Sequence, residues 1–240
     1  MNETPRIERM RHELKRRRLN VARIESLGSK RKRVVLQGEE LAGFTSPGFD
    51  DHVKVFFPGE PAAMRDFTPR RFDGRELWID FFEHAEGPGA QWLEQAIVGH
   101  TLEIGGPKGS AIISTEGIDT HVLIGDETAI PAIARRLEEL PAGARSLLVV
   151  ELDAESATPD FLSRASLQIV RVPRDGIIDA LRALAFPKGN SFFWVACESN
   201  CARAIRRYLR EERQVGLAWI KAAGYWKRGA AGTHDKLAEE

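Results

Sequence analysis

The tetrapeptide Arg65-Asp66-Phe67-Thr68 combines residue types that suit a phosphorylated, aromatic ligand. Side chains alternate along a strand, so Phe67 is expected to point away from Asp66 and Thr68. A guanidinium binds phosphate oxygens bidentately, and a flat aromatic side chain can stack on a flavin ring. The hydroxyl or backbone N–H of Thr68 suits the polar edge of that ring. The pattern indicates flavin binding, although a strand with one core aromatic reads the same way.

A second set of residues lies where a strand pattern gives way to a short helix that opens with Gly-Pro-Gly. The first turn of a helix presents unpaired backbone N–H groups and partial positive charge, which suits a diphosphate. Trp92 can cover an adenine or pack beneath the turn, and His84 can bond a phosphate or ribityl oxygen or be purely structural. The expected cofactor contacts here are Asp80, Phe81, Phe82, His84, Pro88, Gly89, Ala90, Gln91 and Trp92, with Ser110 from a later Gly-rich turn.

A third set follows a buried strand pattern and opens a helix: Gly125, Asp126, Glu127 and Thr128. A dinucleotide phosphate suits this position, although acidic and hydroxyl residues also cap a helix without any ligand. No G-x-G-x-x-G motif is present, so the usual dehydrogenase fingerprint is missing.

Acidic residues follow the next strand pattern, in the run Glu151-Leu152-Asp153-Ala154-Glu155. If the adenosine ribose lies there, these carboxylates would repel a 2′-phosphate and favour NADH over NADPH.

The elements that position these residues change character midway along the chain. Residues 18–110 read as short strands with turn signals such as Gly28-Ser29 and Asp73-Gly74, plus one short helix, which predicts a closed β-barrel with a helical cap. From residue 119, apolar strands alternate with helical patterns, including a polar helix near 159–164, which predicts a parallel sheet. We therefore predict a basic N-terminal arm (1–17), a β-barrel domain (18–115) and an α/β nucleotide-binding domain (116–240).

The composition is that of an ordinary globular protein, with 42% hydrophobic residues and zero net charge. No apolar stretch reaches transmembrane length, and the N-terminus lacks the apolar core of a secretory signal, so a cytoplasmic protein is expected. Two cysteines, Cys197 and Cys201, are too few for a disulfide framework. Twelve basic residues against four acidic ones within residues 1–33 give a local excess of about +8. This excess indicates a solvated arm or a basic rim for an anionic ligand. A nucleic-acid-binding arm would need interleaved aromatics, which are absent.

The order of these motifs resembles the siderophore-interacting protein family, the ferric-siderophore reductases. RDFTPR, IDFFEH, GPGAQW, GGPKGS, GDET and GYWKRG occur in the family's order across residues 20–230. The resemblance implies a ferredoxin-reductase-like FAD barrel followed by a nicotinamide domain, with Trp226 bordering the flavin or closing the last strand. It also implies electron transfer from NADH or NADPH through FAD to a ferric siderophore. Basic side chains in the corresponding segments, Lys54, Lys108 and Lys227, would then bind the anionic chelate.

The chain departs from the family pattern at three positions: Phe67 replaces a Tyr, Gly89 an Ala and Cys197 a Gly. None of these changes removes a group that FAD binding needs, and no permanent metal site is expected. Alternatives are a broad-specificity or ferredoxin-fed ferric-chelate reductase, and a non-catalytic ferric-siderophore binding protein. The sequence does not select one siderophore or an oligomeric state.

Overall fold

The computed structural model describes residues 4–28, 30–59, 63–82, 87–230 and 235–236. The chain forms two compact units, which we call the N-terminal unit (residues 8–112) and the C-terminal unit (residues 1–7 and 113–240). The division falls within β1 (Ile7–Arg11) and β9 (Gly109–Ile113), which pair with each other. The expected arm over residues 1–17 therefore needs correction: residues 7–11 are a strand, and residues 16 and 17 begin the next one.

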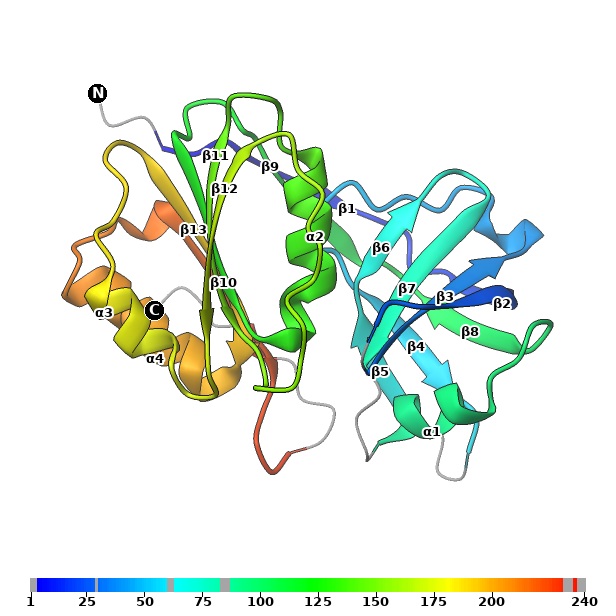
Figure 1. Cartoon of the computed structure of the whole chain (residues 1–240). Coiled ribbons are helices and arrows are strands. Elements are labelled where there is room, and N and C mark those ends of the chain that lie inside the picture. The colour runs from blue at the N-terminus through cyan, green and yellow to red at the C-terminus, as the bar shows by residue number, and fades with distance from the viewer. Residues whose placement is uncertain (1–3, 29, 60–62, 83–86, 231–234, 237–240) are drawn as a thin grey trace. The chain divides into compact units, whose positions relative to one another are not determined.

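The N-terminal unit is built on a seven-stranded antiparallel sheet (Figure 1). The strand order is β5-β4-β8-β2-β3-β7-β6. β5 ends at Phe67 and β6 begins at Pro69, so the two edge strands are joined through Thr68 alone and the sheet must curl around its core. The strands are β2 (Arg16–Ser26), β3 (Arg31–Gln37), β4 (Val53–Phe57), β5 (Ala63–Phe67), β6 (Pro69–Phe72), β7 (Glu76–Phe82) and β8 (Thr101–Gly105).

Local sequence explains the turns and the single α-helix of this unit. At the β6–β7 turn, Asp73 Oδ1 accepts hydrogen bonds from the backbone N–H groups of Arg75 (3.0 Å) and Glu76 (2.8 Å), and Gly74 takes a positive φ. Helix α1 (Pro88–Gln95) begins with proline at its first position and buries Trp92 and Leu93. These two side chains join a core of alternating strand residues such as Val55, Leu77, Ile79 and Ile104.

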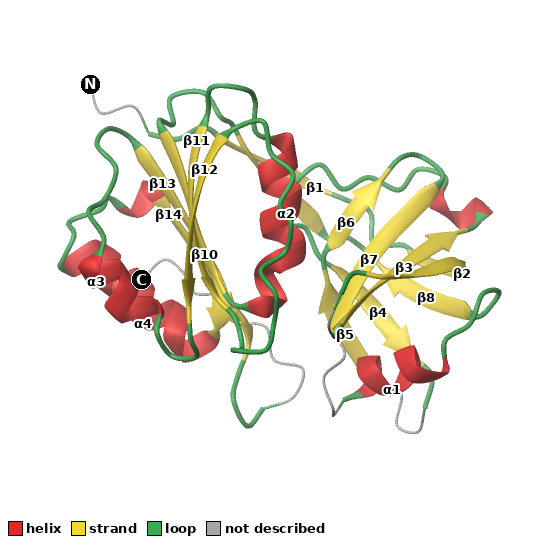
Figure 2. Ribbon diagram, in the orientation of Figure 1, coloured by secondary structure: helices red, strands yellow, loops and turns green. Residues whose placement is uncertain are grey.

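The C-terminal unit contains five parallel strands in the order β12-β11-β10-β13-β14, with a short antiparallel strand β15 beside β14. Figure 2 shows α2 on one face of this sheet and α3 and α4 on the other. All six residues of β10 are buried, as expected for a central strand covered on both faces. The elements of this unit are β10 (Thr120–Gly125), α2 (Ile130–Glu139), β11 (Arg145–Glu151), β12 (Ser166–Val172), α3 (Ile177–Ala183), β13 (Ser191–Glu198), α4 (Ser199–Glu211), β14 (Ile220–Trp226) and β15 (Asp235–Lys236), with 3-10 turns at Glu127–Ala129 and Leu217–Trp219. A further 3-10 turn, Glu39–Leu41, belongs to the N-terminal unit.

The structure confirms the predicted fold class and corrects two of its details. The barrel is a curled sheet, because among the described strands β5 and β6 remain unpaired edges. The polar helix expected near 159–164 is absent: residues 152–165 form an irregular connection. Tertiary hydrogen bonds hold this connection instead, from Ser156 Oγ to Glu127 Oε1 (2.7 Å) and from Ser163 Oγ to the Leu137 carbonyl (2.8 Å). None of the helices in the described ranges is long and apolar enough to cross a membrane.

The buried imidazole of His121, on β10, makes the stability of the fold depend on pH. Its Nδ1 accepts a hydrogen bond from Arg136 (3.4 Å), and its Nε2 has no partner in the described part of the chain. Burial, and secondly the charge of Arg136, lower the pKa of His121 to about 3 from an ordinary value of 6.5. The unfolded chain therefore binds a proton that the folded chain rejects, and stability is lost as the pH falls below the unfolded pKa.

From this group alone we expect the free energy of unfolding to fall by about 1.4 kcal/mol per pH unit between roughly pH 6 and pH 4. Urea unfolding at several pH values, compared between the wild type and His121→Gln, measures the difference in slope. Equal slopes for the two proteins would show that His121 does not contribute.

Candidate functional site

The C-terminal unit places its first and fourth strands side by side, so the sheet has a topological switch point between β10 and β13. Ligands of open parallel sheets bind outside the carboxyl ends of the strands at such a point. The backbone is tightly packed there. A Cβ at Gly125 would lie 2.6 Å from the Ala129 Cβ and 2.7 Å from the Ala196 carbonyl oxygen, so only glycine fits at the end of β10.

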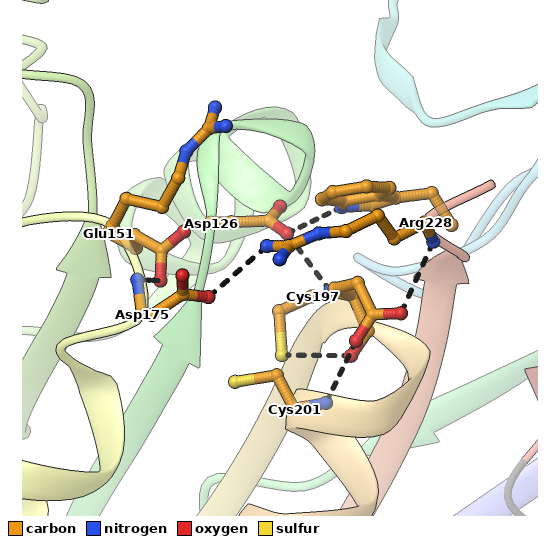
Figure 3. A pocket seen from close by; sticks show the side chains of 9 residues that line it. Asp126, Glu151, Asp175, Cys197, Cys201 and Arg228 are labelled. Carbon is orange, nitrogen blue, oxygen red and sulfur yellow. Dashed lines mark hydrogen bonds and ion pairs between the residues drawn. The ribbon is translucent and has the colours of Figure 1, made fainter.

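A pocket opens at this edge of the sheet, and its walls come from residues that end or follow each of the five parallel strands. Figure 3 shows these side chains converging from separate elements. The lining residues are Asp126, Glu151, Arg174, Asp175, Cys197, Glu198, Cys201, Trp226 and Arg228.

Asp126 is the centre of the hydrogen-bond network in this pocket and is only 6% exposed. Its Oδ1 accepts from the backbone N–H (2.9 Å) and the hydroxyl of Thr128. Its Oδ2 accepts from the Glu198 N–H (3.0 Å) and the Trp226 indole N–H (2.7 Å). Asp126 thus joins the ends of β10, β13 and β14. Burial raises the pKa of Asp126, and the hydrogen bonds from Thr128 and Trp226 oppose that rise.

Glu198 connects the pocket to helix α4. Its Oε2 accepts from the backbone N–H groups of Asn200 (2.7 Å) and Cys201 (3.0 Å), which caps the helix. Its Oε1 accepts from the Arg228 N–H (3.3 Å), and the Arg228 guanidinium forms an ion pair with Asp175 (3.2 Å). The segment after β14 is therefore tied to two other walls of the pocket.

Glu151 ends β11 and brings a further carboxylate into the pocket. Its Oε2 accepts from the Asp175 N–H (2.9 Å), and burial raises the pKa of Glu151. The acidic run predicted to contact a ribose thus begins inside the pocket. Arginines accompany it: Arg171 donates to the Asp153 carbonyl (2.7 Å), and Arg174 pairs with the Asp153 carboxylate (3.4 Å). Because arginines lie beside the acidic residues that would repel a 2′-phosphate, the preference for NADH stays a prediction.

The residues predicted around Asp126 are brought together only in part. Thr128 and Trp226 bond directly to Asp126. Glu127 points elsewhere, because its carboxylate accepts from Ser156 Oγ and from the Asp153 N–H (3.3 Å). Glu127 thus anchors the irregular connection after β11.

In the N-terminal unit, Arg65 and Phe67 lie on the edge strand β5, and both are partly exposed. The Arg65 guanidinium donates to the Met64 carbonyl (2.8 Å), and its other donors have no acceptor in the residues that the structure describes. Phe67 packs against Phe81, with ring centroids 4.4 Å apart, and edge-on against Phe57 at 6.0 Å. A partly exposed arginine and a partly exposed aromatic ring beside an unpaired strand edge are available to a ligand.

Helix α1 contacts β4, β5 and β7, so its N-terminus belongs to the same end of the curled sheet. No side chain caps it, and its first turn holds no acidic residue. Gly89 leaves open the space where a Cβ would lie 3.4 Å from Phe57 and 3.6 Å from Phe67. Uncapped N–H groups, a nearby guanidinium and a stacking aromatic fit the diphosphate and the ring of FAD.

The remaining residues predicted for FAD differ in accessibility. Pro88, Ala90 and Gln91 lie in the first turn of α1 and are at least partly exposed, as is Phe82 on β7. Phe81 and Trp92 are core residues in contact with each other, so Trp92 packs beneath the turn. His84 lies outside the described residues.

Three polar residues of the predicted set already have protein partners or little exposure. Asp80 forms a bidentate ion pair with Arg33 (2.7 and 2.9 Å). Ser110 is buried, donates to Asp51 Oδ2 (2.6 Å) and lies 2.7 Å from His12 Nε2. Thr68, between the two edge strands, is 8% exposed. The side chains of Asp80 and Ser110 thus form contacts within the N-terminal unit.

The three predicted substrate-binding lysines are exposed but not equivalent. Lys54 pairs with Asp66 (2.9 Å). Lys108 follows the Gly106–Pro107 turn, and Lys227 follows Trp226. Within the described ranges, neither Lys108 nor Lys227 forms an ion pair.

Sequence reasoning missed five residues of the pocket: Arg174, Asp175, Glu198, Cys201 and Arg228. They belong to three segments, which lie after β12, across the end of β13 and the start of α4, and after β14, and no single motif contains them all. Their shared signal is position, because each follows or ends a parallel strand, and such strand ends meet at one edge of the sheet.

Family comparisons cover both units. Residues 20–64 and 58–111 match a siderophore-interacting FAD-binding domain, and residues 118–229 match the siderophore-interacting protein model. An NADPH-dependent ferric-chelate reductase of Escherichia coli is 33% identical over 94% of this chain and 99% of its own length. A ferric vibriobactin reductase of Vibrio cholerae is 32% identical over 82% of this chain and 84% of its own length.

Solved structures agree with these matches. A siderophore utilization protein from T. fusca is 33% identical, with a TM-score of 0.86 over 97% of this chain and 100% of its own. A ferredoxin NADP+ reductase from Neisseria gonorrhoeae shares the fold alone, with 9% identity and a TM-score of 0.61 over 88% of this chain and 99% of its own. The family models match both units, and a relative is similar to this chain over nearly its whole length. The chain therefore belongs to the siderophore-interacting protein family.

Proposed function

We propose that the protein is a ferric-siderophore reductase, which passes electrons from NADH or NADPH through FAD to Fe(III) held by a siderophore. The observation that carries this function is that one chain of this family contains two features. One is a strand edge that fits FAD, and the other is a pocket at the switch point of a parallel sheet, where nucleotides bind. Relatives named as ferric-chelate and ferric vibriobactin reductases support it.

The chain's own residues bind and orient the reactants. Arg65 and the uncapped N-terminus of α1 hold the FAD diphosphate, and Phe67 stacks on the ring system. The pocket around Asp126 receives the nicotinamide nucleotide, with Glu151 at the position of a ribose contact. When bound, FAD would supply the redox chemistry that links a two-electron donor to a one-electron acceptor. The iron is substrate and leaves as Fe(II), which hard oxygen donors hold less strongly.

The exposed lysines attract the anionic chelate. Because Lys54 is already paired with Asp66, its charge should matter less than that of Lys108. We expect Lys108→Ala to raise the KM for an anionic ferric chelate about 3-fold at low salt and less at high salt, with FAD content unchanged. Steady-state assays of Lys54→Ala and Lys108→Ala at two ionic strengths check this order. An unaltered KM for Lys108→Ala would remove this lysine from the binding surface.

Stopped-flow spectroscopy of the FAD-loaded protein tests the function directly. Flavin absorbance should bleach on mixing with NADPH or NADH and return on mixing with a ferric siderophore, with Fe(II) trapped by a ferrous chelator. A protein that binds the ferric siderophore but never bleaches would instead be a carrier. Bleaching by reduced ferredoxin alone would identify an iron–sulfur protein as the donor.

A further inference from the structure

Two thiols that the proposed electron transfer does not use lie together in the pocket of the C-terminal unit. Cys197, near the end of β13, is 1% exposed, and Cys201, in the first turn of α4, is partly exposed. The Cys197 thiol donates a weak hydrogen bond to the Glu198 carbonyl oxygen (3.7 Å), and Cys201 packs against the core cluster that contains Cys197. Figure 3 shows the two sulfur atoms next to each other at the pocket wall.

We propose that Cys197 and Cys201 form a reversible disulfide, and that its formation weakens nucleotide binding in this pocket. The second half of the proposal rests on the proposed function, which puts the nicotinamide nucleotide there. Hydrogen peroxide is the oxidant. Cys201–SH and H2O2 give Cys201–SOH and one water. The Cys197 sulfur then attacks the sulfenic sulfur, and its proton leaves with the hydroxyl as a second water.

The different surroundings of the two thiols set this order. The thiolate is the reactive form of cysteine, and access decides which one meets the oxidant. The contact with Cys201, burial, and the carboxylates of Asp126 and Glu151 raise the pKa of Cys197 well above its ordinary value. Cys201 is the more accessible thiol, so it reacts first and Cys197 resolves the intermediate.

The disulfide is coupled to the pocket through the cap of α4. A disulfide bond is only about 2.05 Å long, so its formation draws the first turn of α4 toward β13. The N–H of Cys201 is bonded to Glu198 Oε2, and the other oxygen of Glu198 holds the Arg228 N–H. The N–H of Glu198 itself is bonded to Asp126. Movement of Cys201 therefore displaces a residue that contacts two other walls of the pocket.

Mass spectrometry of the full-length, FAD-loaded protein tests the bond. Trypsin releases both cysteines in one peptide, residues 189–203, because it cleaves after Lys188 and Arg203. After hydrogen peroxide treatment and alkylation, the unreduced peptide should be lighter than the thiol form by two hydrogen atoms and should carry no alkyl group. Dithiothreitol should restore two alkylatable thiols. Cys197→Ser and Cys201→Ser are matched controls that cannot form the bond.

Titration with NADP+ and NAD+ tests the coupling. For whichever of the two nucleotides binds, we expect oxidation to raise the Kd about 10-fold, which is within the usual range of coupling between sites. Reduction should reverse this change. In Cys201→Ser, peroxide and dithiothreitol should produce no reversible change.

Each contrary outcome identifies what fails. Two thiols that stay alkylatable, or that oxidise separately, overturn the disulfide and leave the proposed function standing. A disulfide that forms without changing the Kd overturns the coupling. A reduced protein that binds neither nucleotide overturns the assignment of the pocket, while the mass measurement still decides the disulfide.

Discussion

Replacing Arg65 with alanine is expected to raise the Kd for FAD by about 30-fold, equivalent to about 2 kcal/mol for lost charge-assisted hydrogen bonds. Arg65 lies in the middle of the edge strand β5, opposite Val55 on β4. Only one of its donors is bonded within the described part of the chain, to the Met64 carbonyl, so the guanidinium is available to a phosphate. Arg65→Lys keeps the charge but loses the bidentate geometry and should fall between the wild type and the alanine variant.

Fluorescence titration of the apoprotein with FAD measures this effect. Arg75→Ala is the matched control, because Arg75 is an exposed arginine on the turn between β6 and β7 of the same sheet. Lys227→Ala should also leave the Kd for FAD nearly unchanged. If Arg65→Ala and Arg75→Ala bind FAD equally well, the diphosphate does not lie at β5.

Replacing Asp126 with alanine is expected to lower the free energy of unfolding by about 3 kcal/mol, because several partly buried donors lose their acceptor together. These donors belong to Thr128, Glu198 and Trp226, on three separate segments. Asp126→Asn keeps one carbonyl oxygen for Glu198 and Trp226 and turns an amide toward Thr128. Its loss should be smaller, also because the asparagine removes a charge that burial penalises.

Urea unfolding followed by circular dichroism measures this difference. Asp119→Ala is the control, because Asp119 precedes the same strand at its opposite end, is exposed, and accepts a backbone hydrogen bond from Asn190 (2.8 Å). Its cost should be about 1 kcal/mol. Asp126→Ala should also weaken nucleotide binding, since the side chain of Trp226 loses its anchor. Equal destabilisation by the Asp119 and Asp126 variants would refute the central role of Asp126.

Features set by short-range chemistry could be predicted from the sequence. The Asp73-Gly74 turn, the proline-led start of α1 and the alternation of apolar strands with helices all follow from neighbouring residues, and the structure contains each of them. The helix start after β10 could likewise be predicted, because a strand end followed by a helix start is visible locally.

Local patterns failed where a distant partner decides the conformation. The stretch 152–165 looked helical near its end, but its polar groups bond Glu127 and Leu137 from other segments. Ser110 lies in a motif that predicts cofactor binding, yet its hydroxyl donates a hydrogen bond to Asp51 and lies within hydrogen-bond distance of His12 Nε2. Hydrogen-bond competition of this kind depends on residues far apart in sequence and leaves no trace in a local motif.

Both architectures and their order along the chain could be predicted from local patterns, and the motifs of the N-terminal unit predict the FAD-binding segment. The pocket could be located only in the folded chain, because its lining residues come from the ends of five strands whose order along the sheet differs from their order along the chain. Parallel strands align their carboxyl ends at one edge of the sheet. Side chains separated by up to 102 positions, from Asp126 to Arg228, are thereby gathered at one point.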